Sequence, residues 1–396
     1  MANGEHRAKV WAAGIVAAVL AAYLLAVVWP LPQYFTQGIP SSSTNIETPC
    51  ARNMISGDHL QINYFYWIFS DMLQGKTRFL YNPYEFNKGD DTQCYAPGGY
   101  NVPYSFVYAL GLLSGNRCVA WNLMLLVVAL LSGLLFYLYL RQLLIGRALA
   151  MALACAHVGV PYRWISAMGG SPTGIAMVCV PLLMLGVHLF VAKRRWGGYL
   201  MALVALLIVY ADEYNVFLFG VLTLPLTSLI AIFHGRDRLF ERSWREWGEV
   251  AWRLGALMAI IAGMGLRIMF TLTEALEGSA TGSDRPLTEV AGFSPHAIGL
   301  VKWMENGINA HAFVGIGAFL FLICFGVHVV LHLRRRGVKA ALGDPAVLLP
   351  AMLWLFVIGA VSLALGTNGP VDYLALRVVR KLIPGMDLLR QPAKIY

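Results

Sequence analysis

Residues 118–140 read CVAWNLMLLVVALLSGLLFYLYL, a run that contains no charged side chain. An α-helix needs about 20 mainly apolar residues to cross the hydrocarbon core of a bilayer, so this run predicts a membrane-spanning helix. Comparable runs recur along the chain. We expect nine spans, at 10–31, 118–140, 147–160, 174–192, 198–211, 215–233, 252–272, 309–331 and 345–366. The sequence therefore predicts an all-α polytopic membrane protein.

The composition supports this class. The chain has 396 residues, of which 58% are hydrophobic and 13% charged, and a soluble protein of this length needs more polar surface. The first run, Val10–Pro30, is longer than the apolar part of a secretory signal peptide, and no small-residue cleavage site follows it. We therefore expect it to be the first span of a single transmembrane domain that comprises residues 1–396.

The net charge of +9 comes largely from short basic segments between the predicted spans. Two of them stand out, one from Arg236 to Arg253 and one from Arg334 to Lys339. Short loops rich in Lys and Arg stay on the cytoplasmic side, which places the N-terminus in the cytoplasm. Such loops also suit anionic lipid head groups. The charge distribution therefore predicts membrane lipids as partners and argues against nucleic acid.

This topology places a large first loop, about 32–117, on the extracytoplasmic side. Its middle, Asp58 to Gly75, reads DHLQINYFYWIFSDMLQG, with apolar residues close to helical spacing. Trp and Tyr favour the level of the lipid head groups, so we predict a helix lying at the membrane interface. In the same loop, Cys50 has two candidate partners for a disulfide bond, Cys94 and Cys118.

A second amphipathic helix is predicted at Leu374–Ile383, also on the outer side. Its polar face carries Arg377, Arg380 and Lys381, and Pro384-Gly385 ends it. The chain then finishes at Tyr396 without a closing span. We therefore expect this sequence to be the N-terminal part of a longer protein.

Acidic residues gather at the outer boundary of the predicted membrane: Asp58, Asp90, Asp91, Asp212 and Glu213. Each has an ordinary structural interpretation beside a functional one. Asp58 heads the predicted interfacial helix with Gln61 three residues on, as in a capping box. Asp212-Glu213 forms either a polar turn or the mouth of a water-filled cavity, and Asp90-Asp91 fits a turn. Together the five carboxylates are candidate ligands for Mg²⁺ or Mn²⁺, although their spacing is not diagnostic of a metal site.

Arg267 lies in the outer third of its predicted span. An intramembrane Arg is a functional candidate by default, and here it would suit a lipid phosphate. The alternative is that its side chain extends to the outer head groups. The chain contains no Walker motif, dinucleotide fingerprint, HExxH or G-x-S-x-G, so nucleotide-driven pumping and serine hydrolysis have no support.

Two stretches carry a resemblance to a known family. They are GDHLQINYFYWIFSDMLQGKTRFLYNPYEFNKG at 57–89, after the first span, and LALGTNGP at 363–370 followed by LIPGMDLLRQPAKIY at 382–396. With the layout of many spans and a large first outer loop, the chain resembles the GT-C superfamily of polytopic glycosyltransferases. It is most similar to bacterial members that glycosylate cell-envelope polymers.

The resemblance implies an inverting glycosyltransferase of the bacterial inner membrane. Its donor would be a sugar on a polyprenyl phosphate, and its acceptor a glycan, a lipid or a protein. The resemblance also implies that Asp58 is the key carboxylate and that Asp212 and Glu213 form a second acidic position. Arg390 to Pro392 resembles a late Arg-x-Pro motif, after which such enzymes continue into further spans.

Elementary chemistry agrees with these roles. Glycosyl transfer needs a base for the incoming hydroxyl, for which Asp58 is our candidate, and a carboxylate also stabilises positive charge on the sugar. The departing lipid phosphate calls for a cation, and Arg267 and Arg390 are the candidates. A multi-span transporter or lipid flippase is the alternative, although the sequence shows no internal repeat. A non-enzymatic scaffold would leave the aromatic first loop unexplained.

Overall fold

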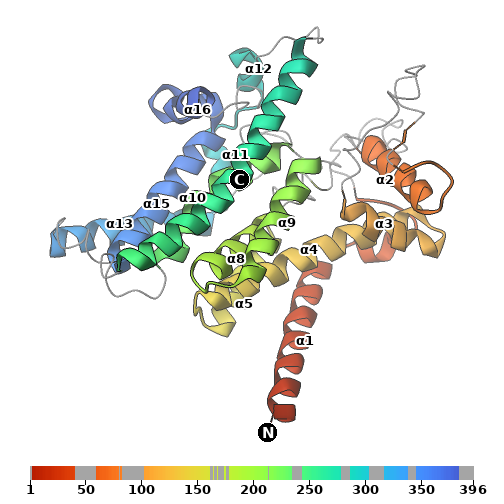
Figure 1. Ribbon diagram of the computed structural model, residues 1–396, viewed down its shortest axis with the longest axis horizontal. Helices are drawn as coiled ribbons and strands as arrows, with labels where there is room; N and C mark the ends of the chain where they lie inside the picture. Colours follow the sequence, from red (N-terminus) through yellow and green to blue (C-terminus); the bar gives the residue numbers. More distant parts are fainter. Residues whose placement is uncertain are drawn as a thin grey trace. The chain divides into compact units, whose positions relative to one another are not determined.

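The fold of the described residues is entirely helical. The computed structural model describes residues 2–40, 59–79, 81–82, 102–160, 164, 167, 174, 178–212, 214–233, 243–277, 286–302, 316–337 and 345–382, and these ranges contain helices and turns but no β-strand (Figure 1). The chain divides into two compact units, and each is described by itself. Unit 1 comprises Met1–Leu185 and Val204–Phe217, and unit 2 comprises Gly186–Leu203 and Leu218–Tyr396.

Unit 1 is organised around the long apolar helix α4. Its helices are α1 (Ala2–Val27), η1 (Leu31–Tyr34), α2 (His59–Leu73), α3 (Tyr104–Gly111), η4 (Leu112–Ser114), α4 (Arg117–Gln142) and α5 (Arg147–Val158). α4 packs against α1, α3 and α5. The core on one side of α4 includes Leu24, Val28, Leu125, Val158 and Trp164. α4 carries no polar stripe, which is typical of a helix that is buried in a large core or spans a membrane.

Two asparagines fix the beginning of α4. Asn116 is the N-cap, and its side-chain oxygen accepts hydrogen bonds from the amides of Cys118 (2.8 Å) and Val119 (3.2 Å). Its side-chain amide donates to the carbonyl of Thr36 at 2.8 Å. In the second turn of α4, the side-chain amide of Asn122 donates to the carbonyls at positions 35 and 38 at 2.9 and 2.8 Å. The segment that leaves η1 is therefore tied to the first two turns of α4.

Unit 2 contains the later helices. α8 (Cys179–Val191), α9 (Trp196–Asp212) and α10 (Tyr214–Phe233) contribute residues to both units, and unit 2 continues with α11 (Trp244–Glu277), α12 (Leu287–Gly292), η5 (Ala297–Leu300), α13 (Ile316–Arg336), α15 (Pro345–Ala364), η6 (Gly366–Asn368) and α16 (Pro370–Leu382). α13 and α15 lie side by side, and so do α15 and α16 (Figure 1).

Glycines allow close packing within unit 2. A Cβ on Gly186 would lie 2.6 Å from the amide nitrogen of Ala202, and one on Gly198 would lie 2.5 Å from the carbonyl oxygen of Gly186. Neither backbone could move aside for a side chain, so the glycines are required for this approach of α8 to α9. Small residues at i and i+4, here Gly198 and Ala202, are typical of such contacts in membrane proteins.

Each of the nine predicted spans contains a helix of the structure, although the crossing of a membrane is a separate question. Within the described residues, two helical segments are long and apolar enough to span a bilayer, Arg117–Gln142 and Trp244–Leu266. Their length and composition are compatible with membrane association.

One helix begins earlier than the sequence predicted. The basic loop was expected to include Arg245 and Arg253, whereas α11 begins at Trp244 and carries both residues. The start is set by a reciprocal capping box. The amide of Ser243 donates to Glu246 Oε2 at 3.2 Å, and the amide of Glu246 donates to Ser243 Oγ at 3.3 Å.

Candidate functional site

Most of the predicted site residues lie outside the described part of the chain. Asp58, Asp90, Asp91, Glu213 and Arg390 are in this group. Asp212 is the last residue of α9 and Arg267 lies within α11, but their side chains are not among those described. The roles of these seven residues therefore stay predictions.

The predicted disulfide and the predicted metal site also involve residues outside the described part of the chain. Cys50 and Cys94 lie outside the described residues, while Cys118 is a free thiol. The described residues contain no group of three His, Cys, Asp or Glu side chains arranged to hold a metal ion. Four of the five predicted metal ligands lie outside those residues, and the side chain of the fifth, Asp212, is not described.

The predicted helix after Asp58 is confirmed as α2, which begins at the next residue, His59. Its buried face includes Tyr66 and Phe69, both with no exposed surface. The Tyr66 ring lies 5.1 Å from that of Tyr108 and 6.0 Å from that of Trp121. Phe69 meets Phe106 edge to face at 5.0 Å. Aromatic rings thus hold α2 against α3 and α4, and this packing fixes the orientation of its other face.

That other face lines a cavity of about 370 Å³, which we call the aromatic pocket. Its volume lies within the usual range for small-molecule sites. The lining residues come from α2, α3, the start of α4 and the segment after η1. They are Ile39, Asn63, Tyr64, Trp67, Tyr108, Arg117 and Cys118.

The aromatic pocket combines ring faces with a few polar groups. The rings of Tyr64 and Trp67 lie 6.1 Å apart at 48°, and the Tyr64 hydroxyl donates to Asn82 Oδ1 at 2.7 Å. Burial raises the pKa of Tyr108, an effect that the nearby Arg117 partly opposes. The Tyr108 hydroxyl therefore stays neutral at ordinary pH. Arg117 is exposed and contributes a permanent positive charge to the lining.

Sequence reasoning missed Tyr108 and Arg117 as site residues. The signal for Arg117 was present, because Asn116 before an apolar run marks a helix start and so places Arg117 in the first turn of α4. No local signal identifies Tyr108. Its position in the pocket depends on the contact between α3 and α2, which the amino-acid order does not reveal.

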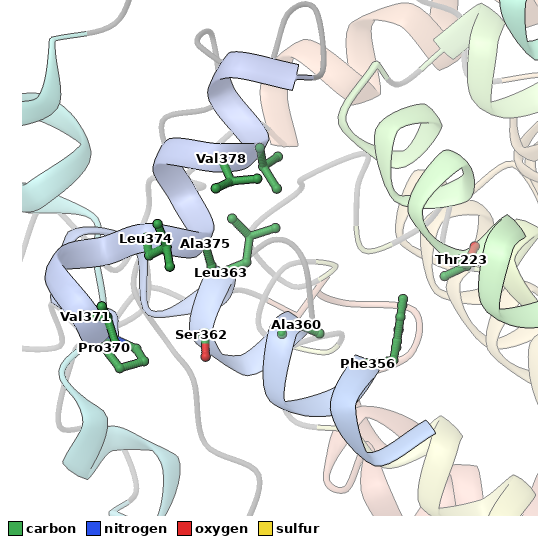
Figure 2. Close-up of a pocket in the computed structure, with 12 residues that line it drawn as sticks. Thr223, Phe356, Ala360, Ser362, Leu363, Pro370, Val371, Leu374, Ala375 and Val378 are labelled. Atoms are coloured by element: carbon green, nitrogen blue, oxygen red, sulfur yellow. The ribbon is translucent and has the colours of Figure 1, made fainter. Parts of the chain in front are cut away.

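A second cavity lies within unit 2, and we call it the α15–α16 groove (Figure 2). Its volume is about 550 Å³. The lining is almost wholly hydrocarbon and is supplied mainly by two consecutive helices. It consists of Thr223, Phe356, Gly359, Ala360, Ser362, Leu363, Pro370, Val371, Leu374, Ala375, Val378 and Val379.

A hydrogen-bonded corner joins α15 to α16. The amide of Thr367 donates to Ser294 Oγ at 3.0 Å, and the side chain of Asn368 donates to the Ser294 carbonyl at 2.9 Å. The hydroxyl of Ser294 in turn donates to the Val290 carbonyl at 2.8 Å. The segment after α12 therefore secures the turn between the two helices that line the groove.

The predicted helix 374–383 is confirmed by α16 as far as Leu382, and its right-handed turns follow Tyr373 as predicted. Its first turn is unusual because Val371, Asp372 and Tyr373 have φ values of 54°, 50° and 46°. Left-handed backbone costs about 1–2 kcal/mol for each non-glycine residue. The adjoining cluster of Val290, Leu363 and Leu376 supplies apolar burial that offsets this strain.

No protein-family model matches the chain, and neither the curated proteins nor the solved structures include one that matches it.

Proposed function

We propose that this protein is a membrane glycosyltransferase that moves a sugar from a polyprenyl phosphate to an envelope acceptor. The proposal includes nine spans, a cytoplasmic N-terminus and a place in the bacterial inner membrane. It rests on the resemblance to the GT-C superfamily in 57–89 and 363–396. The structural observation that supports it is the aromatic pocket, because that pocket is lined by the second and third turns of the helix that directly follows Asp58.

The aromatic pocket has the character that a sugar site needs. The C–H face of a pyranose ring packs against aromatic faces, which Tyr64 and Trp67 provide. Asn63 can exchange hydrogen bonds with sugar hydroxyls, and the neutral Tyr108 hydroxyl can donate one. Arg117 suits the phosphate to which the donor sugar is attached. A few convergent polar groups in an otherwise apolar cavity are the usual basis of orientation in ligand sites.

In the proposed reaction, Asp58 accepts the proton of the acceptor hydroxyl as the new glycosidic bond forms. The bond from the sugar to the lipid phosphate breaks, and the lipid phosphate departs with the bond's electron pair. Arg267 and Arg390 are the proposed cations for that phosphate. Asp212 and Glu213 form the proposed second acidic position, and the carboxylates of Asp58, Asp90, Asp91, Asp212 and Glu213 are the proposed ligands for any Mg²⁺ or Mn²⁺.

The deciding experiment compares Asp58→Asn with Asp71→Asn in proteoliposomes. Polyprenyl phosphate carrying a radiolabelled hexose is the donor, and a cell-envelope extract supplies acceptors. Loss of a general base lowers the rate about 10²- to 10⁴-fold, so Asp58→Asn should lose nearly all transfer. Asp71 lies at the other end of the same helix, paired with Lys76 at 3.4 Å, and its variant should keep full activity. Equal activity in the two variants would remove Asp58 from the mechanism.

The same proteoliposomes test the transporter or flippase alternative. Movement of the labelled lipid across the bilayer without any glycosylated product would support that alternative and contradict the glycosyltransferase proposal. Product formation that depends on Asp58 would exclude it.

A further inference from the structure

The α15–α16 groove differs in chemistry from the aromatic pocket. Only Thr223 and Ser362 among its lining residues carry a side-chain hydroxyl, and no charged residue lines it. Figure 2 shows Leu374, Ala375 and Val378 of α16 on one side and Ala360 and Leu363 of α15 on the other. Such a surface can bind hydrocarbon but offers almost nothing to a sugar or a nucleotide.

The helix that lines the groove also carries positive charge outside it. Arg377 and Lys381 are exposed and Arg380 is half-buried, and none of the three is a lining residue. Arg377 pairs with Asp372 at 3.2 Å and lies 5.2 Å from the centre of the Tyr373 ring. Three cations and one carboxylate give this helix a net charge of +2. Apolar and basic side chains therefore lie on different faces of one short helix.

Contacts outside the groove fix the position of α16 relative to α15. Leu376 is 1% exposed and packs with Val290 and Leu363, while the Ser294 hydrogen bonds secure the corner before α16. The face of α16 that carries Leu374, Ala375 and Val378 is consequently presented to the groove by packing on other residues. A preformed apolar surface binds a chain without first having to be ordered.

We propose that the α15–α16 groove holds one acyl chain of an anionic membrane phospholipid, whose phosphate lies against Arg377, Arg380 and Lys381. Hydrocarbon fits the lining, and the net positive charge beside it selects an anionic head group. We commit to a bilayer phospholipid because the groove matches a bare hydrocarbon chain and has no polar lining for a sugar. This proposal does not depend on glycosyl transfer.

The test uses the full chain in proteoliposomes that contain phosphatidylglycerol or phosphatidylcholine with a photoreactive diazirine near the middle of one acyl chain. After illumination, labelled peptides are mapped by mass spectrometry. Peptides from α15 and α16 should be labelled at least fivefold more strongly by phosphatidylglycerol than by phosphatidylcholine. Equal labelling by the two lipids would overturn the proposal, because the groove would then hold only unselected bilayer lipid.

Charge variants separate the head group from the chain. In the triple variant R377Q/R380Q/K381Q, labelling by phosphatidylglycerol should fall to the level of phosphatidylcholine, which should itself stay unchanged. Arg245→Gln alters an exposed cation of another helix and should keep the full preference. A preference that survives the triple change would contradict the proposal.

Two further measurements complete the test, one of salt dependence and one of competition by another lipid. If the triple variant fails to fold, the wild-type preference is measured at 0.05 M and 1 M salt, and screening should weaken it. A preference unaffected by salt would count against the head-group contact. In the other arm, unlabelled polyprenyl phosphate is added at equimolar amount. Complete displacement of phosphatidylglycerol from α15 and α16 would assign the groove to that lipid and overturn the phospholipid proposal.

Discussion

Arg253 lies over the ring of Phe190. The guanidinium carbon is 4.9 Å from the centre of the Phe190 ring, and Nη1 of Arg253 donates a hydrogen bond to the Phe190 carbonyl at 3.1 Å. The guanidinium carbon also lies 4.8 Å from the centre of the Trp252 ring, and Nη2 contacts Glu249 at 3.3 Å. An arginine that marks a basic loop in the sequence therefore binds α11 to the end of α8.

Replacing Arg253 should destabilise unit 2. Arg253→Met removes the hydrogen bond and both ring contacts, and we expect a loss of about 2 kcal/mol in the free energy of unfolding. Arg253→Lys keeps the charge without the planar group and should lie in between. Unfolding by a graded SDS titration in mixed micelles measures the change. The exposed Arg245→Ala is the control and should stay within about 0.5 kcal/mol of wild type. If Arg253→Met and Arg245→Ala lose the same free energy of unfolding, the contacts of Arg253 with Phe190 do not stabilise unit 2.

A pair of adjacent glycines tests the α8–α9 contact. Gly198→Val should cost at least about 1–3 kcal/mol, because the new side chain meets backbone atoms of α8. Gly197→Val introduces the same β-branched residue into open space and should cost much less. Both variants replace glycine by valine in the same helix, so the change in helix propensity is the same in each and does not affect the comparison. Similar midpoints in SDS unfolding for the two variants would rule out the close approach at Gly198.

The capping box at the start of α11 makes a local prediction. Ser243→Ala removes one of its two hydrogen bonds and should weaken the first turn by about 1 kcal/mol, which corresponds to roughly fivefold faster amide exchange there. Hydrogen–deuterium exchange resolved by mass spectrometry measures this effect. Exchange near Gly263, in the middle of the same helix, should not change. Faster exchange along the whole of α11 would instead indicate a global loss of stability.

The aromatic pocket can be tested through Trp67. Trp67→Leu retains an apolar side chain but removes the flat face, so we expect the KM for the sugar–lipid donor to rise about tenfold, the equivalent of 1.4 kcal/mol. Trp67→Phe keeps a ring and should retain most of the affinity. Radiolabelled transfer in proteoliposomes supplies both kcat and KM. If KM is unchanged in Trp67→Leu, the ring does not bind substrate.

The proposed orientation can be checked with single cysteines in a background that lacks the six native ones. Lys76→Cys lies just beyond α2, and Arg245→Cys lies in the first turn of α11; both wild-type side chains are exposed. In intact cells, a membrane-impermeant maleimide should label the first and spare the second. Permeabilised cells should label both. Labelling of Arg245→Cys alone would invert the proposed topology.

The pattern of apolar residues predicted where the helices form, because long apolar runs such as 118–140 and 345–366 rarely adopt any structure other than a helix. The helix after Asp58 was also predictable, since its apolar residues recur at helical spacing. The start of α11 was predicted incorrectly, although Ser243 and Glu246 form a recognisable capping box. The basic residues near Arg253 suggested a loop instead, and only tertiary packing shows that Phe190 and Trp252 contact this arginine.

The two cavities were beyond the reach of sequence. Tyr108 and Arg117 lie beside Trp67 because α3 and α4 pack against α2, and a contact between distant segments leaves no local pattern. The groove follows a kink at Val371–Tyr373, where Val371 and Tyr373 adopt a left-handed conformation that their side chains disfavour. The amphipathic character of α16 was predictable, whereas the surface that its apolar face helps to form was not.

The amides of Asn116 and Asn122 have a consequence for the long segment between η1 and α4. Because the carbonyls at 35, 36 and 38 are bonded to the very helix where that segment ends, both its entrance and its exit are fastened at one place. Lengthening a closed loop is cheap once its ends are joined, at about 0.6 kcal/mol for each doubling. Insertions into this segment, away from α2 and α3, should therefore disturb the beginning of α4 very little.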